Sequence, residues 1–494
     1  MRKERAISPR IALIPVLAGV FFAADDQTII VTVLPQIMVD LNVEITELHN
    51  AAWTITGYLL GYVCAIPIMG NLSDIYGRRN VYGYAMVIFM VGSVASALSN
   101  SVEWLLFSRI IQSIGAGALI PVAIALIGDL YPPDKRGLPL GVAGGVAEAG
   151  AMIGPLLGGV ITQFFDWRWI FWMNIPIGIF IIIALYIYTP SSKRRDVKVD
   201  YIGFGLITGI LCFLTLACTK VATPGFSMIL YFSIAATFAI AYIGFASRIS
   251  YSPIIPNVLF RSVNFCASNC AHFIYGASLI IAMVTIPLMA NTILRGSPMD
   301  GGLMLARMTI AIPIGAILGG ILCRFRDHRI PLLLSLAISS LCLYSMSTWT
   351  DNIPEPQMTL QLFTCGIGFG LLIAPVNLSA LNSFAPDYRG IASGIITSSR
   401  IIGMTLGIAA LSAWGGNKFG DLIAGIPLPI PTAGDTASQI MEKTASFESN
   451  ITGVGISLFN DFFTAAAVLC LIAVIPCLFV TNKNSSSSND PHLH

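Results

Sequence analysis

About fourteen apolar stretches, each long enough to cross a lipid bilayer as a helix, constrain this chain more than any other feature. Only 11% of its residues are charged, against about 25% in soluble proteins. Backbone polar groups inside a bilayer have to bond to one another, which favours helices. We therefore predict an all-α integral membrane protein with fourteen spans, near residues 11–34, 50–71, 80–99, 103–129, 138–164, 169–189, 201–221, 227–247, 266–292, 298–323, 330–348, 357–380, 390–415 and 460–481.

The loops between these stretches alternate in charge. Basic residues gather at the N-terminus and in every second loop, for example at Arg78, Lys135, Arg324 and Arg389, whereas the other loops carry mainly acidic residues. The positive-inside rule then places both termini in the cytoplasm of a cell whose plasma membrane holds the protein. A net charge of +2 gives no reason to expect nucleic acid as a partner.

Two sequence segments recur at a spacing of about 250 residues. The loop PDKRG at 133–137 is repeated as PDYRG at 386–390, and the loop at 70–79 has a weaker copy at 320–329. Such a repeat is typical of transporters built from two similar halves. We predict an N-terminal six-helix half at residues 1–189 and a linker with two inserted helices at 190–250. A C-terminal six-helix half follows at 251–481, with an extracytoplasmic segment at 416–460, and the chain continues as a disordered tail at 482–494.

A few charged residues lie deep within the apolar stretches, where each costs roughly 2.5 to 3.5 kcal/mol. Such residues usually face a bundle interior or a cavity and mark a substrate or ion pathway. Asp25 and Asp26 are neighbours in one predicted helix, so only one of them can face the cavity. Together the candidates for proton coupling in a central cavity are Asp26, Asp25, Arg109, Glu148, Arg307 and Arg400.

Glu148 and Arg400 lie at matched depths in the two repeats, each about ten residues past the repeated loop and roughly 16 Å into the membrane. They are predicted to face one central cavity. The alternative for Glu148 is a static buried ion pair with Arg109 or Arg400, and the alternative for Arg307 is a side chain that snorkels outward. His272 is interpreted as a packing residue rather than a proton relay. The ten cysteines show no metal or disulfide spacing.

Four motifs resemble a known family. They are DQTIIVTVLP at 26–35, GNLSDIYGRR at 70–79, RIIQSIG at 109–115 and GAMIGPLLGG at 150–159. As a set they are similar to the signatures of the major facilitator superfamily, in its fourteen-span drug:proton antiporter branch. The third motif departs from the family at Ser113, where glycine is usual. The resemblance implies a proton-driven exporter that works by alternating access and places Arg109 close to Asp26.

The resemblance also assigns two structural devices. The cytoplasmic gate comprises Gly70, Asp74, Gly77, Arg78 and Arg79, and its carboxylate is expected to meet helix N-termini or arginines of the other half. The alternative for the two arginines is that they only anchor the topology. The antiporter-motif helix contains small residues that allow close helix packing and a proline that bends the helix: Gly150, Gly154, Pro155, Gly158 and Gly159.

A closer resemblance links residues 28–79, Glu148 and the outer segment to mycobacterial lipid exporters, which move triacylglycerides or glycolipids with a lipoprotein partner. It implies a monomer that carries lipids or lipophilic drugs, driven by a proton gradient and without any cofactor. Proton-coupled uptake is the alternative within transport. An integral membrane enzyme acting on lipids would need clustered His, Cys or acidic ligands, and five dispersed histidines do not supply them.

Overall fold

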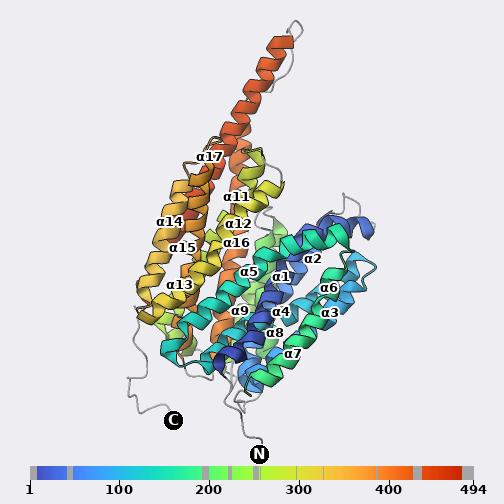
Figure 1. The fold of residues 1–494 in the computed structure, drawn as a ribbon, viewed down its shortest axis with the longest axis vertical. Helices are drawn as coiled ribbons and strands as arrows, with labels where there is room; N and C mark the ends of the chain where they lie inside the picture. The colour runs from blue at the N-terminus through green and yellow to red at the C-terminus, as the bar shows by residue number, and fades with distance from the viewer. Residues whose placement is uncertain are drawn as a thin grey trace, which may run out of the picture.

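The computed structural model describes residues 8–41, 48–191, 200–220, 225–248, 255, 258–295, 298–325, 327–384, 388–424, 426 and 437–480. Within them the chain is mostly helical (Figure 1), and thirteen helical segments are long and apolar enough to cross a membrane. A fourteenth apolar helix, Tyr201–Ala217, is slightly shorter. The predicted all-α membrane fold with about fourteen spans is therefore confirmed.

The helices of the N-terminal half pack mainly on one another. They are α1 (Pro9–Asp40), α2 (Leu48–Tyr76), α3 (Arg78–Ala97), α4 (Val102–Leu130), α5 (Gly137–Phe164), α6 (Trp169–Trp172) and α7 (Asn174–Tyr188). A 3₁₀ turn, η2 (Pro133–Lys135), precedes α5.

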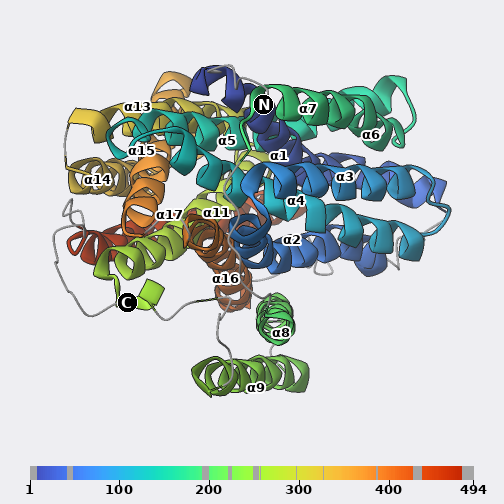
Figure 2. The same cartoon turned by 90° about the horizontal axis from the view of Figure 1, so that it is seen from below.

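The C-terminal half is a second bundle of helices. It contains α10 (Val258–Arg261), α11 (Val263–Thr292), α12 (Pro298–Thr309), α13 (Ala311–Phe325), α14 (Arg329–Met346), α15 (Glu355–Asn382), α16 (Arg389–Ala424) and α17 (Ala437–Cys477). The helices between the halves, α8 (Tyr201–Thr219) and α9 (Phe226–Arg248), lie to one side (Figure 2), where α8 contacts α2 and α16.

The two halves meet chiefly through α5 against α13 and α2 against α16. These pairs are related by the sequence repeat. Their contacts lie near the end of the molecule where α1 begins and α17 stops, which we call the termini end. Toward the opposite end the ribbons of the two halves diverge (Figure 1).

The last two helices differ from the prediction for segment 416–460. We expected a mostly polar loop with helical composition only at 438–448, but α16 has 36 residues and α17 has 41. At 1.5 Å per residue these are ~54 and ~62 Å long, well beyond the ~30 Å of hydrocarbon. Figure 1 shows α17 rising past the other helices. The hydropathy pattern misses this extension because a helix need not end where its apolar stretch ends.

Candidate functional site

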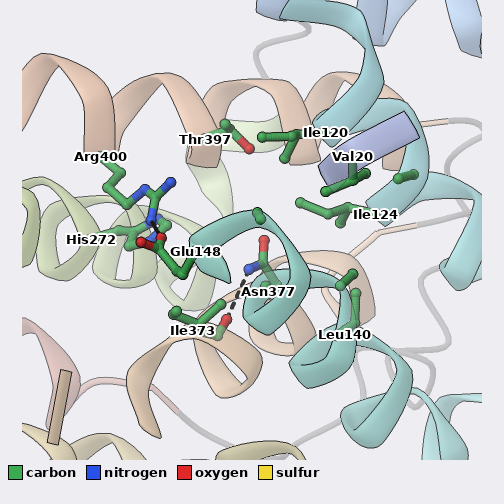
Figure 3. Close-up of a pocket in the computed structure, with 14 residues that line it drawn as sticks. Val20, Ile120, Ile124, Leu140, Glu148, His272, Ile373, Asn377, Thr397 and Arg400 are labelled. Atoms are coloured by element: carbon green, nitrogen blue, oxygen red, sulfur yellow. Dashed lines mark hydrogen bonds and ion pairs between the residues drawn. The ribbon is translucent and has the colours of Figure 1, made fainter. Parts of the chain in front are cut away.

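A small cavity of about 40 Å³ lies between the two halves of the molecule (Figure 3). Glu148 of α5 and Arg400 of α16 meet at its edge and form an ion pair across the halves. Both side chains are mostly buried. The remaining lining is largely apolar and includes Val20, Ile120, Ile124, Leu140 and Ile373. Glu148 and Arg400 therefore share a cavity, as predicted, and they also form the ion pair that was the alternative.

Two buried polar side chains also line this cavity, His272 of α11 and Asn377 of α15. The His272 Nδ1 lies 3.0 Å from the carbonyl oxygen of Ile396, so Nδ1 carries the proton in that contact and Nε2 presents a lone pair. His272 Nε2 and Asn377 Oδ1 have no hydrogen-bond partner among the described residues. A cavity of this size holds one or a few water molecules, which these atoms can bind.

Asp26 lies in a closed polar network inside the N-terminal half. Arg109 donates to Asp26 Oδ2 at 2.6 Å, while Gln112 and Asn174 donate to Oδ1 at 2.8 and 3.2 Å. The Arg109 guanidinium also stacks on the Tyr58 ring, 4.0 Å from its centroid. Arg109 is therefore close to Asp26, as the resemblance implied. Sequence analysis missed Asn174, whose position in α7 carries no local signal.

The structure changes the predicted grouping of the deep charges. Asp25, Asp26 and Arg109 do not line the cavity that holds Glu148 and Arg400. Asp26 points instead toward α4 and α7, because its partners Arg109 and Asn174 lie there. Asp25 is also buried, and its Oδ1 finds no hydrogen-bond partner among the described residues. The backbone of Asp25 packs against Gly150 and Gly154 of α5.

Arg307 also lies outside the central cavity. It donates to Glu355 at 2.6 Å and to Thr359 at 2.9 Å, and about a third of its side chain is exposed. Glu355 begins α15 at the end opposite the termini end. The long side chain of Arg307 extends to an exposed acidic partner, Glu355. The prediction that Arg307 lines the central cavity is therefore wrong, and the alternative of an outward-reaching side chain fits.

Asp74 joins the two halves at the termini end. Its carboxylate accepts hydrogen bonds from the backbone N–H groups of Gly390 and Ile391, at 3.0 and 3.1 Å. These are unpaired donors of the first turn of α16, where the helix dipole favours a negative charge. The Asp74 carboxylate therefore contacts a helix N-terminus of the other half, as predicted.

The two gate arginines differ in their partners. Arg78 bonds to Asp74 at 3.1 Å and to Asp129 at 2.7 Å, and Asp129 also receives Arg389 of the other half at 3.2 Å. Arg79 instead donates to the Thr189 carbonyl oxygen at 3.0 Å and lies over the Tyr186 ring. Both of these partners belong to the N-terminal half, so Arg79 does not bridge the halves as a gate residue would.

Glycines bring the two halves into backbone contact at the termini end. A Cβ atom on Gly70 would lie 2.5 Å from the carbonyl oxygen of Gly390, and one on Gly137 would lie 2.6 Å from that of Gly320. Gly77 has a φ of 89°, which only glycine adopts without strain, and it joins α2 to α3. The termini end is therefore closed, through two contacts that the sequence repeat relates to each other.

Adding a methyl group at this contact is expected to open the termini end. In a Gly70→Ala variant the new Cβ meets the Gly390 backbone, which cannot rotate away. Spin labels at Tyr76 of α2 and Ile330 of α14 should report a longer mean distance, and substrate export should fall at least five-fold. Gly205→Ala is the matched control, because a Cβ there meets nothing within 4 Å. An unchanged distance distribution in Gly70→Ala would show that the contact does not determine closure.

The glycines of the antiporter-motif helix have unequal surroundings. A Cβ on Gly150 would lie 2.4 Å from the Phe21 carbonyl oxygen, and one on Gly154 2.7 Å from that of Asp25, so both allow α5 to approach α1 closely. Gly158 is buried, and its carbonyl oxygen accepts the Thr162 hydroxyl. Gly159 faces open space, so it does not contribute to this packing. The predicted bend at Pro155 concerns a side chain outside those described.

Comparisons with known proteins agree with this architecture. The model of the family described as Major Facilitator Superfamily matches residues 16–408. A triacylglyceride transporter of Mycolicibacterium smegmatis is 30% identical over 94% of this chain and 86% of its own length. Multidrug resistance protein 3 of Bacillus subtilis is 30% identical over 83% of this chain and 80% of its own length.

Two solved structures share the fold. The human organic anion transporter MFSD10 (TETRAN) superposes with a TM-score of 0.63 and 14% identity, covering 95% of this chain and 99% of that one. The proton:xylose symporter XylE superposes with a TM-score of 0.59 and 14% identity, covering 93% and 94%. Among the described residues of this chain, no cluster of three or more His, Cys, Asp or Glu side chains is arranged to hold a metal ion.

Proposed function

Because this chain belongs to the Major Facilitator Superfamily, we propose that it is a proton-coupled exporter that moves lipids or lipophilic drugs by alternating access. It is a membrane transporter and not an enzyme, as its family and the names of its relatives indicate. One observation carries the proposal of proton coupling: Glu148 and Arg400, from opposite halves, pair beside a cavity that is also lined by His272, whose Nε2 has no hydrogen-bond partner among the described residues. A proton that arrives at Glu148 removes the charge attraction that joins the halves there.

The geometry supports a cycle with two linked contacts. In the closed arrangement at the termini end, Glu148 is ionised and paired, and Asp74 holds the first turn of α16. Both contacts are made to the same helix, α16, at Gly390 and Arg400. Protonation of Glu148 weakens the deeper contact, so that the Asp74 contact and the glycine contacts alone keep the termini end closed. Opening then requires less free energy.

The proposed substrate class rests on the names of the relatives and on the lining of the cavity. The relatives are named as transporters of triacylglyceride or as multidrug resistance proteins. The cavity of about 40 Å³ is too small for a lipid in this closed state, but its lining is mostly apolar, so a cavity that widens when the halves separate would suit an amphiphilic or lipid substrate. We place both termini in the cytoplasm, as the charge pattern of the loops indicates. We further propose that the transporter is a monomer in the plasma membrane and that a lipoprotein at the outer face is the partner that receives a lipid.

Proteoliposomes with an imposed pH gradient test this function. The compartment that receives the substrate is made acidic, so that protons flow in the direction opposite to export. Wild-type protein should then move triacylglyceride or a cationic dye and acidify the compartment from which the substrate leaves. If substrate and protons move in the same direction, the protein is an uptake symporter. If substrate moves at the same rate without a gradient, the proposal of proton coupling is wrong.

The extension of α16 and α17 is expected to serve lipid delivery more than proton coupling. The two helices are tied by an ion pair between Lys418 and Asp461 and by Trp414 against Phe462. A lipid that leaves the cavity needs apolar cover at the outer face, which a small cationic dye does not. Replacing residues 420–452 with a short Gly/Ser linker should lower lipid export at least ten-fold and dye export less than two-fold.

Two other outcomes of that replacement contradict this role. Unchanged lipid export would show that the extension takes no part in delivery. Equal loss of lipid and dye export, with unchanged thermal stability of the purified protein, would assign the extension to the transport cycle itself.

A further inference from the structure

A second cavity, of about 630 Å³, lies at the termini end and is separate from the cavity of Glu148 and Arg400. It is formed by the start of α1, the start of α5 and the end of α13, which lie next to one another in the view from that end (Figure 2). Its volume is in the range of sites that bind small molecules. Gly137 and Gly320, whose backbones touch across the two halves, form part of its wall.

The polar part of the cavity is strongly basic. Arg10 of α1, Lys135 before α5 and Arg324 of α13 line it, and Asp134 is the single acidic lining residue. Within the described part of the chain, none of the three basic side chains takes part in an ion pair. Three cations beside one acid leave an excess of positive charge, which fits an anionic ligand.

The rest of the lining is apolar and lies next to the membrane. Leu13, Leu17 and Val142 line the inner wall, while Leu138 and Phe325 are 47% and 70% exposed. Since α1, α5 and α13 belong to segments that are long and apolar enough to cross a membrane, we infer that these exposed side chains face lipid. The cavity therefore has a cationic head region at the level of the lipid headgroups and an apolar surface that continues into the bilayer.

We propose that this cavity binds one anionic phospholipid from the leaflet at the termini end. Its phosphate lies among Arg10, Lys135 and Arg324, and an acyl chain lies along Leu138, Val142 and Phe325. The headgroup contacts come from both halves, because Arg10 and Lys135 belong to the first and Arg324 to the second. The site is complete only while Gly137 and Gly320 touch, so the bound lipid favours the closed termini end. This proposal depends on the membrane fold and not on proton coupling.

Native mass spectrometry of purified, delipidated protein tests the binding. The probes are phosphatidylglycerol, phosphatidylcholine with the same acyl chains, and inorganic phosphate. The variants are the triple change Arg10→Gln, Lys135→Gln, Arg324→Gln, the single change Arg324→Gln, and the matched control Arg261→Gln, an exposed arginine of α10 outside the cavity.

Wild type and Arg261→Gln should retain phosphatidylglycerol over phosphatidylcholine. Each basic side chain near a membrane contributes roughly five-fold to the affinity for anionic lipid. The single variant should therefore bind phosphatidylglycerol about five-fold more weakly, and the triple variant about 100-fold more weakly. Equal retention in wild type and the triple variant would overturn the proposal. If inorganic phosphate displaces phosphatidylglycerol from the wild-type protein at equal concentration, the site binds a free anion and the proposal of a phospholipid is overturned.

A distance measurement tests the effect on conformation without any transport assay. Spin labels at Tyr76 and Ile330 are compared in nanodiscs with and without phosphatidylglycerol at one pH. The lipid should increase the fraction at short distance in wild type and in Arg261→Gln, and leave the triple variant unchanged. A similar increase in the triple variant would show that the lipid acts elsewhere. Because the pH is held constant, failure of the proton-coupling proposal does not change this result.

Discussion

An Asp26→Asn variant is expected to lose export driven by a pH gradient, by at least 100-fold. Asp26 is the buried acid of the first motif, and its Oδ2 pairs with Arg109 at 2.6 Å inside a buried network. The asparagine keeps the shape but removes the charge, so Arg109 becomes a buried cation without a counter-charge. Breaking a buried pair in this way costs roughly 3–5 kcal/mol. Transport in proteoliposomes and thermal stability in detergent should both be measured.

The loss of stability has to be separated from the loss of coupling. The double variant Asp26→Asn, Arg109→Gln has no unpaired charge, and we expect it to recover much of the stability but none of the gradient-driven export. Recovery of export in this double variant would show that the carboxylate serves only to neutralise Arg109. Asp25→Asn should have the milder effect on export, because Asp25 lies outside the Asp26 network. Equal losses of export in Asp25→Asn and Asp26→Asn would contradict the assignment of the effect to the Asp26–Arg109 network.

The sequence predicts the fold well because the bilayer imposes simple rules on it. Apolar length predicts about fourteen spans, and the repeat predicts two similar halves. The contacts of Gly70 with Gly390 and of Gly137 with Gly320 lie in the repeated loops. Asp74 at the N-terminus of α16 follows from its motif, because a helix N-terminus binds a carboxylate wherever the two meet.

The sequence predicts the depth of a charged residue but not the direction of its side chain. Asp26, Glu148 and Arg307 all lie within apolar stretches, yet they have three different environments: a closed network, a shared cavity and an exposed ion pair. Partners from distant helices determine which environment each residue has. His272 is buried and hydrogen-bonded through Nδ1, as expected for a packing residue, but its place in the sequence gives no sign that it lines the same cavity as Glu148 and Arg400.

Glu148→Gln is expected to separate transport from the proton gradient. The amide has the size of the acid and can still accept a hydrogen bond from Arg400, but it carries no charge and cannot release a proton. Export driven by a pH gradient should fall at least ten-fold, while exchange of substrate across the membrane without a gradient should continue. The control is Arg307→Gln, which removes an ion pair outside the cavity and should leave the dependence on the gradient unchanged.

The same pair of residues can be tested by crosslinking, which does not depend on activity. In a cysteine-free background, cysteines at positions 148 and 400 should react with a short crosslinker when the termini end is closed, because the side chains meet there. Cysteines at positions 148 and 307 should not. If the 148–400 pair fails to react in every state although the variant is folded, as judged by its thermal stability, the two residues do not share a cavity.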